Sequence, residues 1–344
     1  MTEISSLNFE ELKQTIKELG LPQFRAKQIY QWLHIKNVDS FDKMTNIDKA
    51  LRKKLSEQFT ISVPEISRKL VSAIDGTQKY LFEFSDGESV ESVLMRYKYG
   101  NSICVSTQVG CAMGCTFCAS TKAGRVRNLT AGEILGQIYR AQTDSGERIS
   151  HVVLMGIGEP LDNFDNVVKF LSMISDANGL NIGQRNISLS TCGVVPNIYR
   201  LAELDLQITL SVSLHAPTDE MRTGMMPINK KYPIGELMEA CRSYVKTTGR
   251  RISFEYSLIK GVNDTPECAH KLCKLLGGML CHVNLIPINS IEQSDYEKSD
   301  RKSIEEFKKI IEEHKITATV RRKLGADINA ACGQLRRESK QLSR

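Results

Sequence analysis

Long apolar stretches are missing from this chain. The longest, such as VVLM at 152–155, fall far short of the roughly 20 residues that a membrane-spanning helix needs. The amino-terminal segment MTEISSLNFEELKQ is acidic and has no basic cap followed by an apolar run, so we do not expect a signal peptide. Internal repeats and low-complexity tracts are also lacking. These absences argue against a membrane or secreted protein, and the cytoplasm is the expected location.

Net charge is low as well, at +6 over 344 residues with a pI near 8.7. By itself this value only makes an acidic partner more plausible than a basic one. The basic residues nevertheless gather in runs at 52–54, 250–251 and 321–323, and in the terminal RRESKQLSR. Each run can be a solvated face or a set of phosphate contacts, and charge alone does not separate these interpretations.

Cysteines, by contrast, are numerous: the chain has ten. Because no export signal is expected, we do not expect the cysteines to form the disulfide framework of a secreted protein. Clustered thiols of cytosolic proteins more often bind metal or perform chemistry. Half of them have no motif around them and are expected to be small buried residues of the core. These are Cys192, Cys241, Cys268, Cys273 and Cys281.

Residues 1–65 are predicted to form a small helical domain. Asn8 and Glu11 fit a capping box ahead of FEELKQTIKEL, and Gly20 stands where this helix should stop. Pro22 opens a second helix, QFRAKQIYQWL, and a third follows in IDKALRKKLSEQF. From about Ile66, RKLVSAI, QKYLFEF and SVESVLMRY alternate in the manner of strands and are separated by Asp-Gly turns. Residues 66–100 are therefore predicted to be a β-hairpin connection.

Beyond residue 100, short apolar runs alternate with helical stretches. The predicted strands are 103–107, 151–156, 186–191, 208–215, 252–259 and 282–288. Strand and helix repeated about six times indicate an α/β fold, a parallel sheet with helices outside it that is either open or curled into a partial barrel. Ligands of such folds bind at the carboxyl ends of the strands, and the motifs described next fall there.

Directly after the first of these strands, Cys111, Cys115 and Cys118 are spaced C-x3-C-x2-C within GCAMGCTFC. Structural zinc sites normally close with four protein ligands, and ordinary 4Fe–4S clusters use four cysteines. Three cysteines instead leave one iron of a cluster open to a substrate or cofactor. The two glycines of this segment relax the loop so that it can wrap a cluster.

This pattern resembles the radical SAM superfamily, in which the open iron binds S-adenosylmethionine (SAM) and an electron from the cluster splits SAM to give a 5′-deoxyadenosyl radical. A supporting motif, GIGEP at 156–160, ends the second predicted strand. Its glycines let the backbone approach the methionine end of SAM, and Glu159 can hold the SAM ammonium group. The GIGEP motif alone is weak evidence, but in register with the cysteines it is strong.

The resemblance becomes specific along nearly the whole chain. GRVRNLTAGEI, MGIGEPLDN, LSTCGVVP, SLHAPTDEMR, PINKKYPI, LIPIN and DINAACGQLRR are similar to the RlmN family, the dual-specificity adenine-C2 methyltransferases of ribosomal and transfer RNA. ACGQL is the most telling segment, because radical SAM enzymes in general lack it. Ile157 and Cys192 are interpreted as neutral variation. The resemblance implies a partial (β/α)6 radical SAM barrel over 101–335 that includes a loop with a catalytic cysteine, followed by a basic tail at 336–344.

The RlmN reaction answers a chemical difficulty: carbon-2 of adenine is electron-poor and does not attack the methyl group of SAM. The resemblance implies that Cys332 first accepts a methyl group, that the adenosyl radical takes a hydrogen atom from it, and that the carbon radical adds to carbon-2, joining RNA to protein. Cys104 matches the thiol that then attacks the Cys332 sulfur and leaves a transient disulfide, and Glu91 matches the residue that takes the carbon-2 proton. Without the resemblance, Cys104 would be interpreted as core packing and Glu91 as a solvated charge.

The other implied site residues bind cofactors. The three motif cysteines would hold one 4Fe–4S cluster, and two molecules of SAM would be consumed per methylation. The residues that match SAM contacts are Gly158, Glu159, Ser190, Ser213, Leu214, His215 and Asn289. For His215, a core histidine hydrogen-bonded to the backbone remains the alternative.

The implied partners are RNA and a reductant, with no membrane. A family member would act on 23S rRNA at the peptidyl-transferase centre before subunit assembly is complete, and on an anticodon-loop adenine of transfer RNAs. It would receive electrons from a donor such as flavodoxin or ferredoxin. The target adenine must be extruded from its RNA context. The helical domain and the basic runs are the candidate phosphate contacts.

Three alternatives remain open. A sister family methylates carbon-8 of the same ribosomal adenine and shares the cluster, both thiols and the fold. A zinc-stabilised RNA-binding protein without catalysis would explain the cysteines and the positive charge, but not GIGEP, Cys332 or the repeated strand–helix order. A radical SAM enzyme with a small-molecule substrate is the third.

Overall fold

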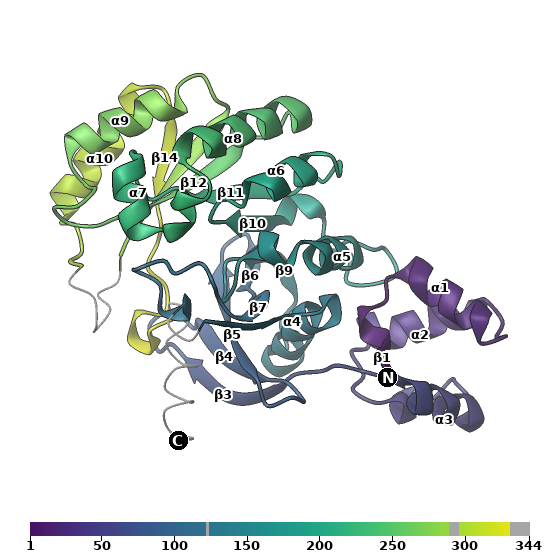
Figure 1. Cartoon of the computed structure of the whole chain (residues 1–344). Helices are drawn as coiled ribbons and strands as arrows, with labels where there is room; N and C mark the ends of the chain where they lie inside the picture. Colours follow the sequence, from purple (N-terminus) through teal and green to yellow (C-terminus); the bar gives the residue numbers. More distant parts are fainter. Residues whose placement is uncertain (122–123, 289–295, 331–344) are drawn as a thin grey trace.

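The computed structural model describes residues 1–121, 124–288 and 296–330 (Figure 1). In this part of the chain, ten strands form one sheet in the order β14-β13-β12-β11-β10-β9-β6-β5-β4-β3. Figure 1 shows helices α1 to α3 as a lobe beside the sheet, and the helices that follow the strands lie along its outer side. None of the described helices is long and apolar enough to cross a membrane.

The amino-terminal lobe has an apolar core of its own. It consists of α1 (Phe9–Glu18), α2 (Phe24–His34), α3 (Lys49–Gln58), the 3-10 turns η1 (Ile4–Ser6) and η2 (Phe41–Lys43), and a pair of short strands, β1 (Thr2–Glu3) and β2 (Phe59–Thr60). The predicted capping box is confirmed: Asn8 and Glu11 exchange side-chain to backbone hydrogen bonds of 2.9 Å. Leu12 and Ile16, one helical turn apart, then bury the inner face of α1.

The antiparallel strands predicted from the Asp-Gly turns are present and extend the main sheet. They are β3 (Glu65–Val71), β4 (Gln78–Glu83) and β5 (Ser89–Tyr97). β5 pairs antiparallel with β6 (Gly100–Cys104), the first strand of the parallel part. The register places Leu81 opposite Glu91 and Val93 opposite Cys104. Two of the predicted site residues therefore lie on neighbouring strands.

The predicted α/β partial barrel is confirmed, with one strand more than expected. The parallel strands are β6, β9 (Ile149–Leu154), β10 (Ile187–Thr191), β11 (Thr209–Ser213), β12 (Ile252–Leu258), β13 (Cys281–Pro287) and β14 (Thr317–Val320). The helices are α4 (Ala131–Ser145), α5 (Phe164–Ile174), α6 (Val195–Ala202), α7 (Asp219–Met225), α8 (Ile234–Thr248), α9 (Pro266–Leu276) and α10 (Arg301–Glu313). The sequence pattern missed β14, because only Ala318 of its four residues is buried and no apolar run marks it.

The strands at the centre of the sheet have one apolar and one polar face. Leu210 of β11 and Phe254 of β12 are fully buried and belong to the core cluster that includes the helices. On the other face, Ser213 of β11 lies in register with Glu255 of β12, and Glu255 with Asn284 of β13, which donates to it at 2.7 Å. Parallel strands buried between two helical layers are apolar on both faces. Since the inner face of this sheet is polar, we expect the barrel to hold a ligand on that side.

The lobe meets the barrel where α2 contacts α4. His34 of α2 and Tyr139 of α4 are both buried, and the His34 Nδ1 atom lies 2.8 Å from the Tyr139 hydroxyl. Burial lowers the pKa of His34 from 6.5 to about 3, because a charged ring would lose its hydration there. The next residue of α4, Arg140, donates to the Pro64 carbonyl at 2.7 Å and fixes the end of the lobe.

Acid should therefore weaken the folded protein through His34. The unfolded chain protonates this ring below pH 6.5, but the folded protein does so only near pH 3, so stability is intact above pH 6.5 and falls as the pH drops below it. The loss is at most about 1.4 kcal/mol per pH unit. In urea unfolding between pH 6.5 and about 5, His34→Gln should show a shallower pH dependence than the wild type. His270→Gln, which changes an exposed histidine, is the control; identical slopes for wild type and His34→Gln would contradict this account.

Candidate active site at the carboxyl ends of the strands

The three motif cysteines line one cavity of ≈ 260 Å³. Their loop follows β7 (Gln108–Gly110), which pairs with β8 (Arg125–Asn128) in a small hairpin that the sequence pattern did not reveal. Gly110 is needed there, since its φ is +77° and a Cβ atom would stand 1.9 Å from the Gly124 carbonyl oxygen. The backbone thus turns sharply just before Cys111, which brings all three thiols to the same cavity.

The thiols of the loop influence one another electrostatically. Burial raises the pKa of Cys111 to about 11 and that of Cys115 to about 12, and the neighbouring Cys118 adds to both shifts. A bound iron cluster would supply the positive charge that stabilises thiolates here. Among the described residues, no three His, Cys, Asp or Glu side chains are grouped to hold a single metal ion. Three sulfur donors around one cavity fit a cluster, which presents several irons to its ligands.

Glu159, in the loop that follows β9, lines the same cavity. Its carboxylate accepts from the backbone N–H groups of Cys192 at 2.7 Å and Leu161 at 2.9 Å. Burial raises the pKa of Glu159 above its ordinary value, although these two hydrogen bonds oppose the shift. A Cβ atom on the preceding Gly158, whose φ is +107°, would lie 2.6 Å from Gln108 Cβ. A buried carboxylate with spare lone pairs beside a close backbone turn fits the ammonium group of SAM.

Three more of the predicted SAM contacts, Ser190, Ser213 and His215, line this cavity. His215 Nδ1 accepts from the Ser257 N–H at 3.0 Å, which assigns the ring proton to Nε2, and burial lowers the pKa of His215 to about 3. His215 is therefore hydrogen-bonded to the backbone and also lines the cavity, and its contact with SAM stays a prediction. The Leu214 side chain is fully buried in the core and does not line the cavity.

A buried arginine ties the strand ends together around this cavity. The Arg222 guanidinium donates to the carbonyls of Cys192 at 2.6 Å, Ser213 at 3.2 Å and Leu214 at 3.3 Å. Its remaining described acceptor is the Asn229 side chain at 3.0 Å, so all four acceptors are neutral. Burial lowers the pKa of Arg222. Because these carbonyls end β10 and β11, Arg222 fixes the backbone that carries the predicted SAM contacts.

A larger cavity of ≈ 450 Å³ adjoins the first. Residues that line both are Phe117, Cys118, Met155, Ile286 and Arg321. Cys104 of β6 lines the larger cavity, and so does Ala330, which ends the described chain two residues before Cys332. Cys104 and Ala330 also belong to one apolar cluster with Val93 and Met95. The cluster loop, Cys104 and the approach to Cys332 thus surround one space, whereas Cys332 itself and Asn289 lie outside the described residues.

Glu91 is fully buried and is not a solvated charge. Its carboxylate forms an ion pair of 3.0 Å with the Lys79 ammonium, which is itself only 1% exposed. Lys79 also donates to the Asn329 carbonyl at 3.0 Å. Glu91 lies on the same face of β5 as Val93 and Met95, which line the larger cavity. Within the described chain, Glu91 itself lines neither cavity, so it lies beside the larger one and not in its wall.

Sequence reasoning missed four residues of the site: Gln108, Cys192, Arg222 and Glu255. Cys192 is buried as expected, but it also lines the cofactor cavity and supplies the N–H that Glu159 accepts. Its position directly after a strand end was an available signal. Glu255 gave a second available signal, because an acidic residue inside an apolar strand needs a polar surface to face.

Substitution of Gly110 should disrupt cluster binding. A Cβ atom at Gly110 meets the Gly124 carbonyl, and such overpacking costs about 1–3 kcal/mol in addition to the strain of a positive φ. Gly146→Ala is the matched control, because Gly146 has a φ of +68° with nothing within 4 Å of the added carbon. After anaerobic reconstitution, Gly110→Ala should hold much less iron and sulfide per chain than Gly146→Ala. Equal iron contents would refute the proposed role of the glycine.

Comparison with known proteins agrees with this geometry. Residues 105–273 match the radical SAM superfamily, and residues 2–61 match the family described as the ribosomal RNA large subunit methyltransferase N-terminal domain. The crystal structure of a radical SAM methyltransferase from Sphaerobacter thermophilus is 42% identical and superimposes with a TM-score of 0.92, covering 97% of this chain and 99% of that one. Fold and site together define a radical SAM enzyme that uses a 4Fe–4S cluster and SAM.

Two bacterial relatives narrow the assignment further. The probable dual-specificity RNA methyltransferase RlmN of Clostridium novyi is 57% identical over 337 residues, which are 98% of each chain. Its counterpart from Lachnospira eligens is 56% identical over 336 residues, 98% of this chain and 96% of that one. The chain therefore belongs to the RlmN family of radical SAM methyltransferases.

Proposed function

We propose that this protein methylates carbon-2 of an adenine in RNA, both at the peptidyl-transferase centre of 23S rRNA and in the anticodon loop of some transfer RNAs. The relatives' names support RNA as the substrate, and the family resemblance supports carbon-2. The observation that carries the proposal is the single cavity lined by Cys118, Cys104 and Ala330. Chain length keeps the Cα atom of Cys332 within about 7–8 Å of that of Ala330.

The thiols of Cys332 and Cys104 have different roles in the proposed reaction. The Cys332 thiolate takes a methyl group from SAM and becomes a thioether. When bound, the cluster and a second SAM supply a carbon-centred radical that removes one hydrogen atom from that methyl group. The carbon left on Cys332 bonds to carbon-2, and the adduct restores the aromatic ring by losing the carbon-2 proton and one electron, which the oxidised cluster would accept. The Cys104 thiolate then attacks the Cys332 sulfur: an S–S bond forms, the C–S bond breaks, and the released carbon takes a proton. A two-electron reductant restores both thiols.

Glu91 is assigned the carbon-2 proton. It occupies the face of β5 whose next residues, Val93 and Met95, line the larger cavity. Lys79 at 3.0 Å compensates its buried charge, because an unpaired carboxylate at this depth would be strongly destabilising. Lys79 also donates to the Asn329 carbonyl, so one lysine contacts both Glu91 and the segment that leads to Cys332. The group that removes the proton and the chain that carries the thiol therefore lie close together.

The rim of the larger cavity is suited to RNA phosphates. Residues 321–323 are all basic and exposed, and they follow β14 directly, so they lie at the carboxyl edge of the sheet. Lys298 and Tyr296 line the same cavity. Arg250 is assigned a structural role, because it precedes β12 at the amino edge and donates to the Ile208 carbonyl at 2.9 Å. Of the basic runs within the described chain, 321–323 is therefore the proposed phosphate contact nearest the chemistry.

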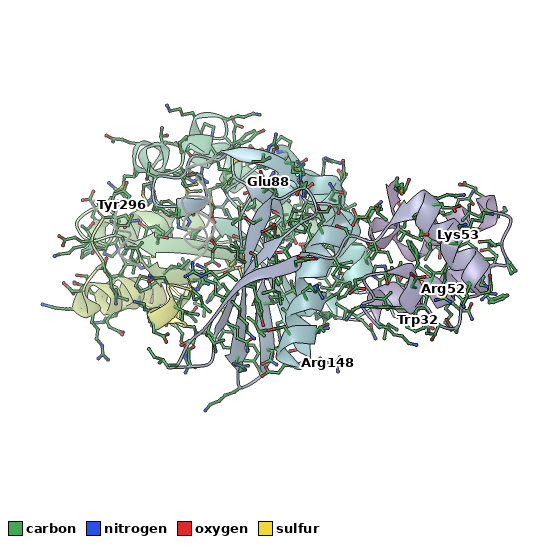
Figure 2. All side chains as sticks on the ribbon, turned by 90° about the horizontal axis from the view of Figure 1, so that it is seen from below. Trp32, Arg52, Lys53, Glu88, Arg148 and Tyr296 are labelled. Atoms are coloured by element: carbon green, nitrogen blue, oxygen red, sulfur yellow. The ribbon has the colours of Figure 1, made fainter. Side chains whose placement is uncertain are left out.

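The amino-terminal lobe is assigned more distant RNA contacts. Figure 2 shows Trp32, Arg52 and Lys53 on the lobe, at the opposite end of the molecule from Tyr296. Both ends can touch one RNA only if it is folded and large, as 23S rRNA before full assembly and transfer RNA are. In this proposal the enzyme works in the cytoplasm and receives electrons from a protein such as flavodoxin or ferredoxin.

Product analysis tests the proposal. The protein is reconstituted anaerobically and incubated with methyl-labelled SAM and protein-free 23S rRNA, and the RNA is digested and analysed by mass spectrometry. We expect the label in 2-methyladenosine. Label in 8-methyladenosine would instead assign the chemistry of the sister family. Unlabelled RNA from a protein that cleaves SAM would show that the substrate is not RNA.

A further inference from the structure

The segment that leads to Cys332, residues 324–330, returns to the antiparallel part of the sheet. Figure 1 shows this yellow segment beside the ends of β3 and β4. It meets the turn that joins those two strands, residues 72–77, called here the β3–β4 turn. The reaction assigned above gives the β3–β4 turn no part, although Thr77 of the turn lines the larger cavity.

Two carboxylates hold the segment and the turn together reciprocally. Asp327 of the segment accepts from the Ser72 hydroxyl at 2.6 Å and from the Ala73 N–H at 2.8 Å. In the opposite direction, Asp75 of the turn accepts from the Gly325 N–H at 2.8 Å. These contacts join parts of the chain that are 250 residues apart. They form a clasp in which each side supplies one acceptor and at least one donor.

The clasp continues toward the reactive groups. Lys79, which follows the β3–β4 turn on β4, donates to the Asn329 carbonyl and pairs with Glu91. Ala330 then packs in the apolar cluster that contains Cys104. Over the short stretch from Asp327 to Ala330, the segment is therefore fixed first to the turn, then to the partner of Glu91, and finally beside Cys104.

The turn has contacts of its own that let it act as an anchor. Its backbone is closed by the Ser72 N–H, which donates to the Thr77 carbonyl at 2.8 Å. Arg96 of β5 donates to the Gly76 carbonyl and forms an ion pair of 2.7 Å with Glu147. These contacts tie the β3–β4 turn to the sheet independently of the segment that it receives.

We propose that the β3–β4 turn is a positioning element: through Asp75 and Asp327 it holds residues 324–330 and sets how often the Cys332 thiol meets that of Cys104. The inference rests on the proposed function, in which these two sulfur atoms must bond. Ser72, Asp75 and Asp327 are positioning residues, since none of them is placed at the reacting atoms. Without the clasp, Cys332 would search a larger volume and the resolving step would slow.

The charge states of the clasp agree with this role. The hydrogen bond from Ser72 lowers the pKa of Asp327. Burial pushes the pKa of Asp75 upward, but its hydrogen bonds with Gly325 and Thr77 outweigh burial and lower the pKa to about 2. Both carboxylates thus remain ionised acceptors above mildly acidic pH.

The test measures the equilibrium between the two thiols and their disulfide. Full-length reconstituted protein is held anaerobically in glutathione buffers, quenched in acid and alkylated, and the Cys104–Cys332 linked peptide is quantified by mass spectrometry. Because both thiols belong to one chain, the equilibrium constant reports their effective concentration. Asp327→Ala removes two hydrogen bonds and should lower this constant about tenfold. Asp86→Ala, in the turn that joins β4 and β5, should stay within about twofold of the wild type.

A change of fold is separated from a change of position by further variants. Ser72→Ala leaves Asp75 and Asp327 in place but removes the hydrogen bond that the Ser72 hydroxyl donates to Asp327, together with those that it accepts from the Ile74 and Asp75 N–H groups. It should lower the constant by about threefold, because only one hydrogen bond between the turn and the segment is lost. Asp327→Ala combined with Asp75→Ala should lower it less than the product of the single effects, because both act on one segment. An unchanged constant in Asp327→Ala, whatever its melting temperature, would overturn the positioning role. This readout needs no RNA: a wild-type protein that forms the disulfide but never methylates RNA would refute the proposed function and leave the clasp intact.

Discussion

Replacement of Cys332 by alanine should reduce RNA methylation on the order of a thousandfold or more, equivalent to about 4 kcal/mol of activation free energy. The reason is chemical: carbon-2 of adenine lies between two ring nitrogens and does not attack the methyl group of SAM. Without the thiol there is no carrier that can present the methyl carbon as a radical. Iron content should be unchanged, because the cluster is assigned to Cys111, Cys115 and Cys118, which line the cofactor cavity.

The control for this substitution is another cysteine. Cys268→Ala changes a buried residue of α9 that belongs to the main core, and it should cost stability but keep methylation. Both variants are assayed with labelled SAM and protein-free rRNA, after their iron content has been matched. A Cys332→Ala protein that methylates RNA at the wild-type rate would remove the thioether from the mechanism, and with it the proposal as a whole.

Replacement of Cys104 by alanine should have the second largest effect, and one of a different kind. The adduct between RNA and Cys332 would still form, since the first steps do not use Cys104. Its C–S bond would then lack the thiol that breaks it, and a covalent RNA–protein complex should accumulate to a large share of the enzyme in a single turnover. Cys104 is the assigned thiol because it lines the larger cavity with Ala330.

Denaturing electrophoresis of labelled RNA measures this complex directly. In the wild type the complex should be barely detectable, and Cys273→Ala, which changes another buried cysteine of the core, should match the wild type. Treatment with a nuclease should reduce the shifted band to the mass of the protein plus a short oligonucleotide. Absence of any complex from a Cys104→Ala protein that retains its cluster would remove the resolving role from this residue.

Much of the site could be predicted because its signals are local. The cysteine spacing, the GIGEP loop and the serines at strand ends each lie within a few residues, and the parallel strands bring them to one edge. The central strands could also be predicted, since apolar and polar residues alternate along β10, β11 and β12. Cys241, Cys268, Cys273 and Cys281 are buried in the core as expected for cysteines without a motif.

The features that were missed depend on contacts that leave no pattern in the sequence. Arg222 binds backbone carbonyls, which every residue has, so its acceptors could not be recognised. The ion pair between Lys79 and Glu91 requires the register of β4 against β5, and a shift of one residue would turn one of the two side chains to the other face. The clasp of Asp75 and Asp327 closes across 250 residues of chain, far beyond any local signal.

The central claim is that the methyl carbon travels through a thioether on Cys332 and loses one hydrogen on the way. SAM with three deuterium atoms on its methyl group tests this most directly. We expect RNA whose new methyl group keeps two of them, with the third recovered in 5′-deoxyadenosine, since the last hydrogen enters as a proton when the C–S bond breaks. A product methyl group that retains all three deuterium atoms would mean direct transfer and would contradict the account.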